Sequence, residues 1–361
     1  MPVENFIHKF SSFLSTQPAA QGFDDIHIIV NPVAGGFTRH SVLHGALEGL
    51  ERINAAGNAA IPVIPKEHVH IHRTHAGGDC EAIVHGITSS SGEEKRILFV
   101  TAGGDGTATE AASELYRFGM QTGNFDNLVL FRMPMGTGND GLDADTMDTA
   151  YAVCAADCTT QKIPLLQIDF ASGTRKYATN IASFGLDAYV TDKTNKLKRI
   201  IPGSFYSVMV DVAALFYEFS VAMEPLELRY TDFSGKSYSD DPVVLLLAMG
   251  VSGNRTYGGG KLVLPGRENV CTIGRMKLGR KFTVKDILYK GEHTELEEVT
   301  MYEAREMTVN FSEKMLFQHD GEVIPLKKED FPVNLRILPP AVQVLRPKDI
   351  TILKNLQGIS A

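Results

Sequence analysis

One pattern of apolar and polar positions repeats three times in the first 140 residues. Each copy has a short apolar run, at residues 26–30, 97–100 and 128–131, then a glycine-rich or polar turn, then a stretch with helical spacing. Short apolar runs rich in β-branched residues, separated in this way, predict βα units and a parallel sheet. Because ligands of such sheets bind beyond the carboxyl ends of the strands, the three turns are expected to meet at one site.

The pattern changes after about residue 160. Strand-like segments with few long helices follow, at 177–182, 226–230, 242–248, 307–311 and 333–338, and residues 204–217 have apolar positions at helical spacing. These segments predict a second, mostly antiparallel β domain on which the helix at 204–217 packs. We therefore predict an α/β domain at 24–158 and a β domain at 159–344, with 345–361 as a segment that returns to the first domain.

Composition narrows the class of protein. The 361 residues are 43% hydrophobic and 22% charged, which predicts two folded domains and excludes intrinsic disorder. A net charge of −8 disfavours a nucleic-acid partner. The longest mostly apolar stretch, residues 243–251, is too short to span a bilayer, and the first 21 residues do not resemble a secretory signal. We expect a cytoplasmic protein without a transmembrane segment.

The second turn carries the most specific chemistry. Gly103-Gly104-Asp105-Gly106-Thr107 follows an apolar run and precedes a helix-like stretch. Glycines let backbone N–H groups close on a ligand, and a helix N-terminus adds partial positive charge, so the turn suits a phosphate chain. The carboxylate of Asp105 beside phosphates calls for a bridging divalent cation, which points to a magnesium nucleotide. The alternative interpretation is a tight strand-to-helix turn in which Asp105 caps the helix.

Two common nucleotide motifs do not explain this turn. Gly258-Gly259-Gly260-Lys261 continues into Leu262 and lacks the hydroxyl of a P-loop. Residues 136–141 fit a Gly-x-Gly-x-x-Gly pattern but follow the third apolar run and are separated from it by Pro134.

A set of motifs in a fixed order is more specific than any one of them. The set comprises Asn31-Pro-Val-Ala-Gly, Thr74 with Gly78-Asp79, Gly-Gly-Asp-Gly-Thr, Pro134-Met-Gly-Thr-Gly-Asn-Asp and Asp320-Gly-Glu322. With this set the chain resembles, over roughly residues 24–340, the diacylglycerol kinase catalytic-domain family, which includes bacterial lipid kinases, sphingosine kinases and ceramide kinases. The resemblance implies an α/β nucleotide-binding domain, a C-terminal β-sandwich domain for the lipid substrate and an active site between them. It also implies transfer of the γ-phosphoryl group of ATP to a lipid hydroxyl.

The resemblance also implies roles for individual residues. Glu322, supported by Asp320, would accept the proton of the lipid hydroxyl, and Asp105 would serve magnesium through the phosphates or act as the alternative base. The residues that would contact the nucleotide are Asn31, Pro32, Val33, Ala34, Gly35, Thr74, Gly103, Gly104, Asp105, Gly106, Thr107, Ala108, Thr109, Gly136 and Thr137.

Three departures from the family pattern keep two other functions open. Thr109 stands where the family usually has Asn, and Asn139-Asp140 is followed by Gly-Leu-Asp instead of an apolar residue, Ala and Arg. Residues 267–272 lack the Asp-Gly turn that holds a structural magnesium in bacterial members, so this metal site is expected to be missing or rebuilt. The alternatives are an NAD kinase-like enzyme, which shares the Gly-Gly-Asp-Gly turn, and a nucleotide-binding regulator without catalysis.

Two further clusters allow a functional and a structural interpretation. His68, His70 and His72 alternate, so a strand would place them on one face, either as a transition-metal site or as a polar strand face. The basic run Lys193, Lys196, Lys198 and Arg199 precedes Ile200-Ile201. It is either a solvated helix face or the place where the protein docks transiently on an anionic membrane that presents the lipid substrate.

Overall fold

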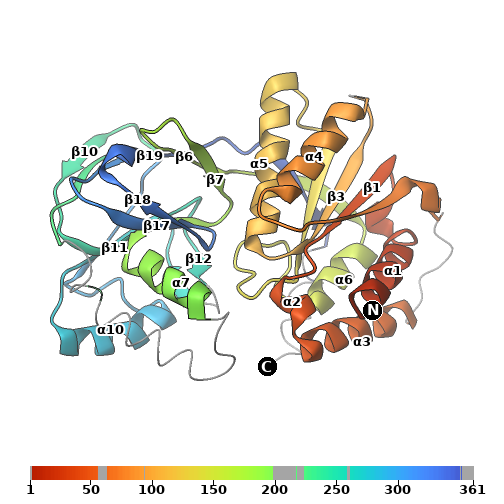
Figure 1. Ribbon diagram of the computed structural model, residues 1–361, viewed down its shortest axis with the longest axis horizontal. Coiled ribbons are helices and arrows are strands. Elements are labelled where there is room, and N and C mark those ends of the chain that lie inside the picture. Colours follow the sequence, from red (N-terminus) through yellow and green to blue (C-terminus); the bar gives the residue numbers. More distant parts are fainter. Residues whose placement is uncertain are drawn as a thin grey trace. The chain divides into compact units, whose positions relative to one another are not determined.

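The computed structural model describes residues 2–55, 63–92, 94–197, 217, 223–257, 261–349 and 351. The chain divides into two compact units (Figure 1): unit 1 comprises Met1–Ile163 and Pro340–Ala361, and unit 2 comprises Pro164–Pro339. Both passages between the units occur at prolines. Proline cannot donate to a strand ladder, so these positions suit the end of a sheet.

Unit 1 is built on one sheet, sheet A. Its strands are β1 (Asp25–Val30), β2 (Val69–Arg73), β3 (Ile97–Gly103), β4 (Leu128–Pro134), β5 (Cys158–Ile163) and β20 (Val342–Pro347). They lie in the order β2-β1-β3-β4-β20-β5, in which all pairs are parallel except the antiparallel pair β20–β5. The predicted α/β unit with a parallel sheet is therefore confirmed.

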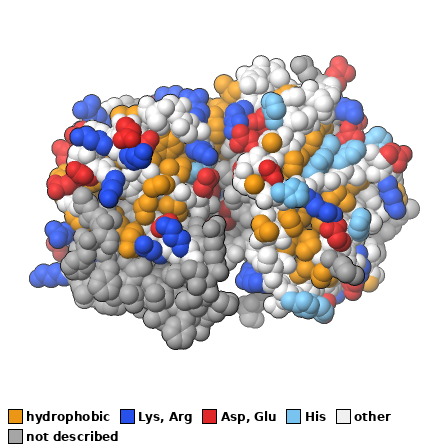
Figure 2. Space-filling model, viewed as in Figure 1, with side chains coloured by type: hydrophobic (Ala, Val, Ile, Leu, Met, Phe, Trp, Pro, Cys, Tyr) orange, Lys and Arg blue, Asp and Glu red, His pale blue; other side chains and the backbone are white. Residues whose placement is uncertain are grey.

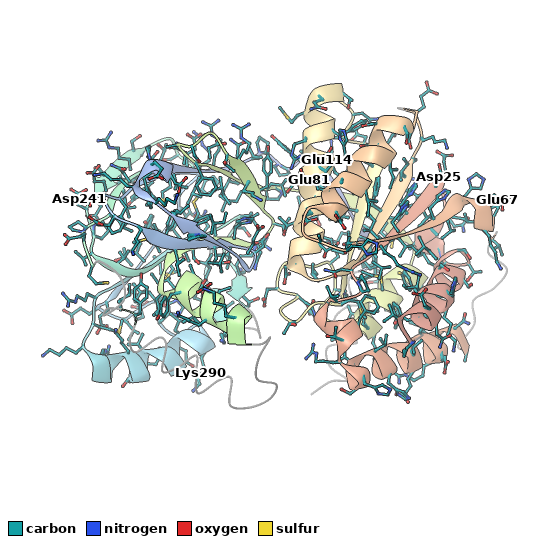
Figure 3. All side chains as sticks on the ribbon, viewed as in Figure 1. Asp25, Glu67, Glu81, Glu114, Asp241 and Lys290 are labelled. Atoms are coloured by element: carbon teal, nitrogen blue, oxygen red, sulfur yellow. The ribbon has the colours of Figure 1, made fainter. Side chains whose placement is uncertain are left out.

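Helices cover both faces of sheet A. They are α1 (Pro2–Leu14), α2 (Gly35–Thr38), α3 (His40–Ala55), α4 (Asp79–Ser90), α5 (Asp105–Thr122) and α6 (Met147–Ala155), with short 3-10 turns at Pro18–Ala20 and Lys66–His68. The helices α1, α3 and α6 share one hydrophobic core with alternate residues of β1, β3 and β4. The helices α4 and α5 lie side by side (Figure 1), and the buried carboxylate of Glu114 on α5 accepts a 2.7 Å hydrogen bond from His85 on α4 (Figure 3).

The N-terminal helix α1 belongs to unit 1, although the sequence pattern placed the start of the first domain at residue 24. Its Phe6, Phe10 and Phe13 are almost fully buried. The ring centroid of Phe6 lies 5.5 Å from that of Phe37, and the ring centroid of Phe13 lies 6.0 Å from that of Tyr151. The aromatic side chains thus attach α1 to the sheet face that carries α3 and α6.

The alternating histidines lie on one face of β2 and its approach, where they form a polar cluster with β1. His68 is hydrogen-bonded to Asp25 at 3.0 Å, and His72 is hydrogen-bonded to His27 at 3.0 Å. Histidine side chains gather on this part of unit 1 (Figure 2), and Asp25 marks its place on β1 (Figure 3). No group of His, Cys, Asp and Glu side chains in the described part of the chain has the arrangement of a metal site. The polar strand face is therefore the interpretation that the geometry supports.

This cluster predicts that unit 1 loses stability in mild acid. Burial, with smaller contributions from His70, His72 and Lys95, lowers the pKa of His27 from 6.5 to about 4, although Asp25 opposes the shift. Between pH 6.5 and 4 the His27 imidazole is therefore protonated in the unfolded chain but neutral in the folded chain. The free energy of unfolding consequently decreases as the pH falls through this range. The free energy of unfolding falls in both proteins when the pH is lowered from 7 to 5. We expect this decrease to be about 1–2 kcal/mol smaller in His27→Phe than in the natural protein.

Urea-induced unfolding of both proteins at the two pH values measures this difference. His8→Phe, which changes a histidine on the exposed side of α1, is the control and should follow the natural protein. Equal losses of stability in the natural protein and in His27→Phe would contradict the prediction.

Unit 2 is an antiparallel sandwich of two sheets. Sheet B has the order β10-β9-β16-β19-β6-β7, and sheet C has the order β15-β14-β11-β8-β17-β18. The strands of sheet B are β6 (Leu166–Asp169), β7 (Arg175–Ala178), β9 (Glu227–Thr231), β10 (Ser237–Asp240), β16 (Glu306–Asn310) and β19 (Val333–Ile337). Those of sheet C are β8 (Ile181–Gly185), β11 (Val244–Gly250), β14 (Val270–Gly274), β15 (Val299–Tyr302), β17 (Met315–His319) and β18 (Glu322–Leu326). Inward side chains of both sheets form one core, which confirms the predicted β-sandwich.

Smaller elements of unit 2 differ from the sequence prediction. The segment 177–182, predicted as one strand, is divided between β7 in sheet B and β8 in sheet C by a turn at Thr179-Asn180. Unit 2 also contains the helices α7 (Leu186–Leu197) and α10 (Leu278–Lys290), the hairpin β12 (Arg255–Tyr257) and β13 (Lys261–Leu264), and a 3-10 turn at Lys328–Asp330. The sequence pattern did not predict α10, and for α7 it indicated only a candidate helix face that begins at Lys193.

Several predicted features lie outside the described residues. These are positions 204–216 of the expected helix, Lys198 to Ile201 of the basic run, Gly258 to Gly260, and residues 350 and 352–361 of the returning segment. Among the residues that the structure does describe, no helix has the length and apolar character needed to cross a membrane.

Candidate active site

The turn from β3 to α5 and the loop after β4 approach each other closely. A Cβ atom on Gly103 would lie 2.7 Å from Thr107 Oγ1, and a Cβ atom on Gly136 would lie 2.5 Å from the Cα atom of Gly104. Real Cβ atoms do not pack at these distances, so glycine is required at both positions. The two predicted glycine turns thus form one surface at the carboxyl edge of sheet A.

The segment after β1 joins the same surface. The Asn31 side chain donates a 3.1 Å hydrogen bond to Thr107 Oγ1, and the backbone N–H of Asn31 donates to the Ala102 carbonyl at 3.0 Å. Gly35, at the start of α2, has no space for a Cβ atom because the Thr137 side chain lies against it. Three segments far apart in sequence therefore meet here, as the parallel sheet predicts.

The loop after β2 lies beside the loop after β1. The Thr74 N–H donates a 2.9 Å hydrogen bond to the Val30 carbonyl, and the Thr74 side chain is buried. Glu110 on α5 accepts hydrogen bonds from the N–H groups of Gly78, at 2.9 Å, and Cys80, at 3.1 Å. Glu110, which the sequence analysis did not single out, therefore fixes the start of α4 against α5.

Asp105 holds the loop after β4. One carboxylate oxygen accepts a 2.9 Å hydrogen bond from the Asn139 N–H, and the other accepts a 3.2 Å hydrogen bond from the Gly141 N–H. Asn139 has a positive φ of 63° and in turn accepts a hydrogen bond from the Gly136 N–H at 2.8 Å. The carboxylate thus orders the loop that carries Gly136 and Thr137. A direct role for Asp105 toward magnesium stays a prediction.

This edge of unit 1 suits a phosphate chain. The 18-residue helix α5 begins at Asp105, and Gly103, Gly104 and Gly106 adjoin its N-terminus. A Cβ atom on Gly106 would meet no atom within 4 Å, so space remains above the turn. Backbone donors combined with the helix dipole favour a polyanion.

Asp320 in unit 2 forms the turn between β17 and β18. One of its carboxylate oxygens accepts hydrogen bonds from the N–H groups of Asn180 and Ile181, and the other accepts from the N–H and hydroxyl of Thr179, all between 2.6 and 3.1 Å. Asp320 adopts a positive φ of 45°. With both oxygens engaged, Asp320 holds the turn in place.

Glu322 is the accessible carboxylate of the same hairpin. Its side chain is 56% exposed, and its oxygens lie 3.8 Å from Lys176 Nζ and 3.5 Å from His319 Nε2. The sequence analysis named Glu322 but missed His319. The available signal was a histidine at a strand position whose alternating neighbours, Met315 and Phe317, are apolar.

A buried polar network fixes the other side of this turn. The Gln318 amide donates to Ser183 Oγ at 2.8 Å and to Asp187 at 2.9 Å, and its oxygen accepts from the Gly321 N–H at 2.9 Å. Asp187, in the first turn of α7, also accepts a hydrogen bond from Ser183 at 2.7 Å. The turn that presents Glu322 is therefore held by Asp320 on one side and Gln318 on the other.

Asn269 occupies the region where the sequence analysis expected a missing or rebuilt metal site. Its side chain is buried, donates to the carbonyls of Gly250 and Ala304 at 3.1 and 2.8 Å, and accepts from the Ala304 N–H at 2.9 Å. The amide thus joins the end of β11, the start of β14 and the segment before β16 by hydrogen bonds.

We expect Asn269→Ala to lower the free energy of unfolding by about 2–4 kcal/mol, because it leaves buried backbone groups without partners. A chelator such as EDTA should leave the melting temperature of the natural protein unchanged. Asn269→Asp is the matched comparison, because the carboxylate keeps the oxygen that accepts from Ala304 and lacks the NH2 group that donates to Gly250 and Ala304. This variant should also be less stable than the natural protein. A melting temperature that falls in EDTA would show that a cation holds this turn.

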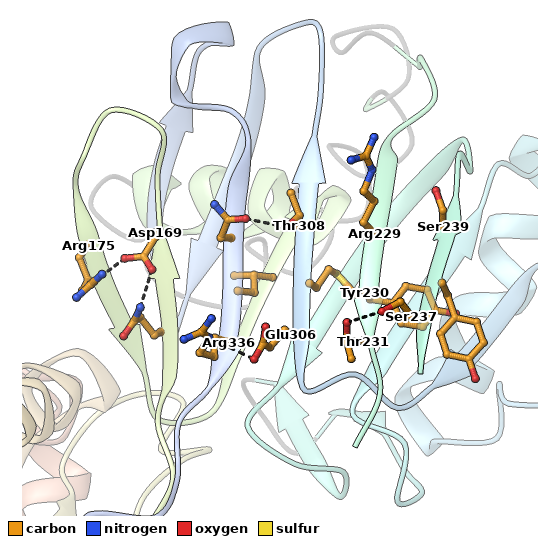
Figure 4. A pocket seen from close by; sticks show the side chains of 15 residues that line it. Asp169, Arg175, Arg229, Tyr230, Thr231, Ser237, Ser239, Glu306, Thr308 and Arg336 are labelled. Atoms are coloured by element: carbon orange, nitrogen blue, oxygen red, sulfur yellow. Dashed lines mark hydrogen bonds and ion pairs between the residues drawn. The ribbon is translucent and has the colours of Figure 1, made fainter. Parts of the chain in front are cut away.

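A polar groove of about 770 Å³ lies elsewhere on unit 2, on the outward face of sheet B. Arg175, Arg229, Thr308 and Arg336 are among the side chains that line it (Figure 4). None of the predicted site residues contributes to this groove. The predicted residues lie at the carboxyl edge of sheet A and at the β17–β18 turn.

Family models match both units. The description of one is "Diacylglycerol kinase catalytic domain", which matches residues 25–163, and that of the other is "YegS C-terminal NAD kinase beta sandwich-like domain", which matches residues 180–346. A diacylglycerol kinase of Mycobacterium tuberculosis (strain ATCC 25618 / H37Rv) is 25% identical over 334 residues, which cover 89% of this chain and 94% of that protein. A protein of Stenotrophomonas maltophilia (strain K279a) named "Probable lipid kinase YegS-like" is 29% identical over 230 residues, covering 61% and 67% of the two chains.

Solved structures show the same fold. The crystal structure of a diacylglycerol kinase from Bacillus anthracis str. Sterne superposes with a TM-score of 0.54 at 17% identity and covers 90% of this chain and 97% of that one. The family models and the named relatives, found together with this fold, indicate a phosphotransferase of the lipid kinase type. The chain thus carries a diacylglycerol kinase catalytic domain followed by a YegS-type C-terminal domain.

Proposed function

We propose that the protein is an ATP-dependent lipid kinase that transfers the γ-phosphoryl group of MgATP to the hydroxyl of a diacylglycerol-like or sphingoid lipid. The observation that carries the proposal is the convergence of three strand-end segments at the carboxyl edge of sheet A, where Asn31 contacts Thr107 and Gly104 lies against Gly136. This arrangement supplies backbone donors and a helix N-terminus but no large side chain. It therefore suits the phosphates of a nucleotide.

Within this proposal, unit 1 binds and orients the nucleotide. The residues from Asn31 to Gly35, Thr74, Gly103 to Thr109, Gly136 and Thr137 surround the phosphates, and Asp105 keeps the loop of Gly136 in place. Magnesium bound with the nucleotide neutralises charge on the phosphates. Rigid, preorganised donors are the main means by which a protein accelerates phosphoryl transfer.

Unit 2 supplies the base in this proposal. Glu322 takes the proton from the acceptor hydroxyl as that oxygen forms its bond to the γ-phosphorus and the bond to the ADP oxygen breaks. Asp320 and Gln318 hold the backbone that presents Glu322. The lipid comes from a membrane surface, so we also propose that the protein works in the cytoplasm and associates with membranes transiently.

Incubation with labelled ATP, magnesium and a panel of lipids tests the function. The panel contains diacylglycerol, monoacylglycerol, a sphingoid base, ceramide and phosphatidylglycerol, and NAD serves as the competing acceptor. Label in a lipid supports the proposal and identifies the acceptor class. Label in NADP would instead establish the NAD kinase-like alternative, and nucleotide binding without any transfer would establish a regulator.

A further inference from the structure

Glu322 faces a buried histidine across its hairpin. His319 and Glu322 are directly opposite one another in the antiparallel pair β17–β18, so both side chains lie on the same side of sheet C. His319 Nε2 lies 3.5 Å from one carboxylate oxygen of Glu322, and Lys176 Nζ lies 3.8 Å from the other. One oxygen of the carboxylate is thus turned toward the imidazole and the other toward the exposed ammonium group.

The environment of His319 is unusual for a polar side chain. It is 3% exposed, its ring centroid lies 6.2 Å from that of Phe317, and within the described residues neither ring nitrogen makes a hydrogen bond of normal geometry. A buried polar group without a hydrogen bond destabilises the folded state, so such groups are rare in native structures. Two acceptors adjoin the ring: the backbone of Tyr177, and the Glu322 carboxylate, which lies about half an ångström beyond an ordinary hydrogen bond from Nε2.

The charges around His319 bear on its protonation. Burial lowers the pKa of the imidazole, and the Lys176 ammonium lowers it further, whereas the carboxylates of Asp320 and Glu322 and the backbone of Tyr177 oppose this shift. The imidazole is therefore neutral near pH 7. A neutral ring has one N–H group to donate.

We propose that His319 is a positioning residue for Glu322. Its Nε2–H donates a hydrogen bond to the adjacent oxygen of Glu322 and holds the carboxylate so that the other oxygen points toward the acceptor hydroxyl. This inference rests on the proposed function, because it assigns a partner to the proposed base. His319 itself does not touch the reacting atoms.

Three variants test the positioning role in the full-length protein. His319→Phe removes both nitrogens and retains a ring beside Phe317. His319→Gln keeps a donor close to the position of Nε2. His293→Gln is the matched control, because His293 is also fully buried in unit 2 but its Nε2 is 3.0 Å from the Val263 carbonyl and not near Glu322.

We expect His319→Phe to lower kcat about 10- to 100-fold with an unchanged KM for ATP. His319→Gln should keep kcat within about threefold of the natural value, as should His293→Gln. Equal losses in His319→Phe and His319→Gln, or natural rates in both, would overturn the proposal.

A second measurement does not depend on turnover. The His319 ring signal in a proton–carbon NMR spectrum, assigned by its absence in His319→Gln, is followed against pH in the natural protein and in Glu322→Gln. Removal of the Glu322 charge should lower the pKa of His319, since that charge raises it. An unchanged titration would refute the contact. A protein that shows the shift but phosphorylates no lipid would refute the proposed function alone.

Discussion

Glu322→Gln is expected to lower the rate of lipid phosphorylation about 10²–10⁴-fold, which is the usual loss when a general base is removed. The amide has nearly the same size as the carboxylate but cannot accept the proton of the acceptor hydroxyl. Because Glu322 lies in unit 2 and the proposed nucleotide residues lie in unit 1, ATP affinity should change little. Steady-state kinetics at saturating lipid, together with calorimetric titration of ATP, separates the two effects.

Glu329→Gln is the matched control for this variant. Glu329 is also an exposed carboxylate of unit 2, 68% exposed and 3.6 Å from Lys327, and it is outside the proposed site. Its rate should equal that of the natural protein. If Glu322→Gln bound ATP poorly but kept its full rate at saturating ATP, Glu322 would be a nucleotide contact and not the base.

Asp105→Asn is expected to reduce phosphoryl transfer by at least about 10²–10³-fold. The carboxylate accepts hydrogen bonds from the N–H groups of Asn139 and Gly141, one on each oxygen. An amide keeps only one oxygen and turns an NH2 group toward the other N–H donor, so the loop that carries Gly136 and Thr137 must move. A magnesium or phosphate contact through Asp105, if the natural carboxylate makes one, would be weakened by the same change.

The fold of unit 1 should survive this change, because Asp105 lies in a turn at the edge of the core. Asp148→Asn is the control: Asp148 is an exposed carboxylate in the same unit, paired with Arg52 at 3.1 Å. Both variants should melt within a few degrees of the natural protein, and only Asp105→Asn should lose activity. Near-natural turnover by a folded Asp105→Asn protein would exclude the proposed role of this residue.

The sheets of both units could be predicted because their signals are local. The apolar runs at 26–30, 97–100 and 128–131 are buried on both faces of sheet A, and such runs are readable without knowledge of their neighbours. Helix α1 was harder to predict. Its phenylalanines are informative only once the surface formed by Phe37 and Tyr151 is known.

The positions of the glycines in the candidate site could also be predicted, but the hydrogen-bond partners of its carboxylates could not. Gly104 and Gly136 follow strands that must end at one edge of a parallel sheet, so their meeting follows from topology. The sequence indicated a magnesium nucleotide or a helix cap as the partner of Asp105 and a supporting role for Asp320, but it did not indicate the backbone groups that either carboxylate binds. In the structure each holds backbone N–H groups of a distant segment.

The sequence by itself determined the fold class, the division into a βα region and a strand-rich region, and the resemblance to the family, because these depend on periodicity and on motifs in order. Only the tertiary structure decided that Thr179 and Asn180 form a turn and not the middle of a strand. Their N–H groups are bound by Asp320, which is 141 residues from Thr179 along the chain. It also placed His319 against Glu322 through the register of β17 and β18. Such contacts depend on how separate segments pack, and no local pattern of residues encodes that packing.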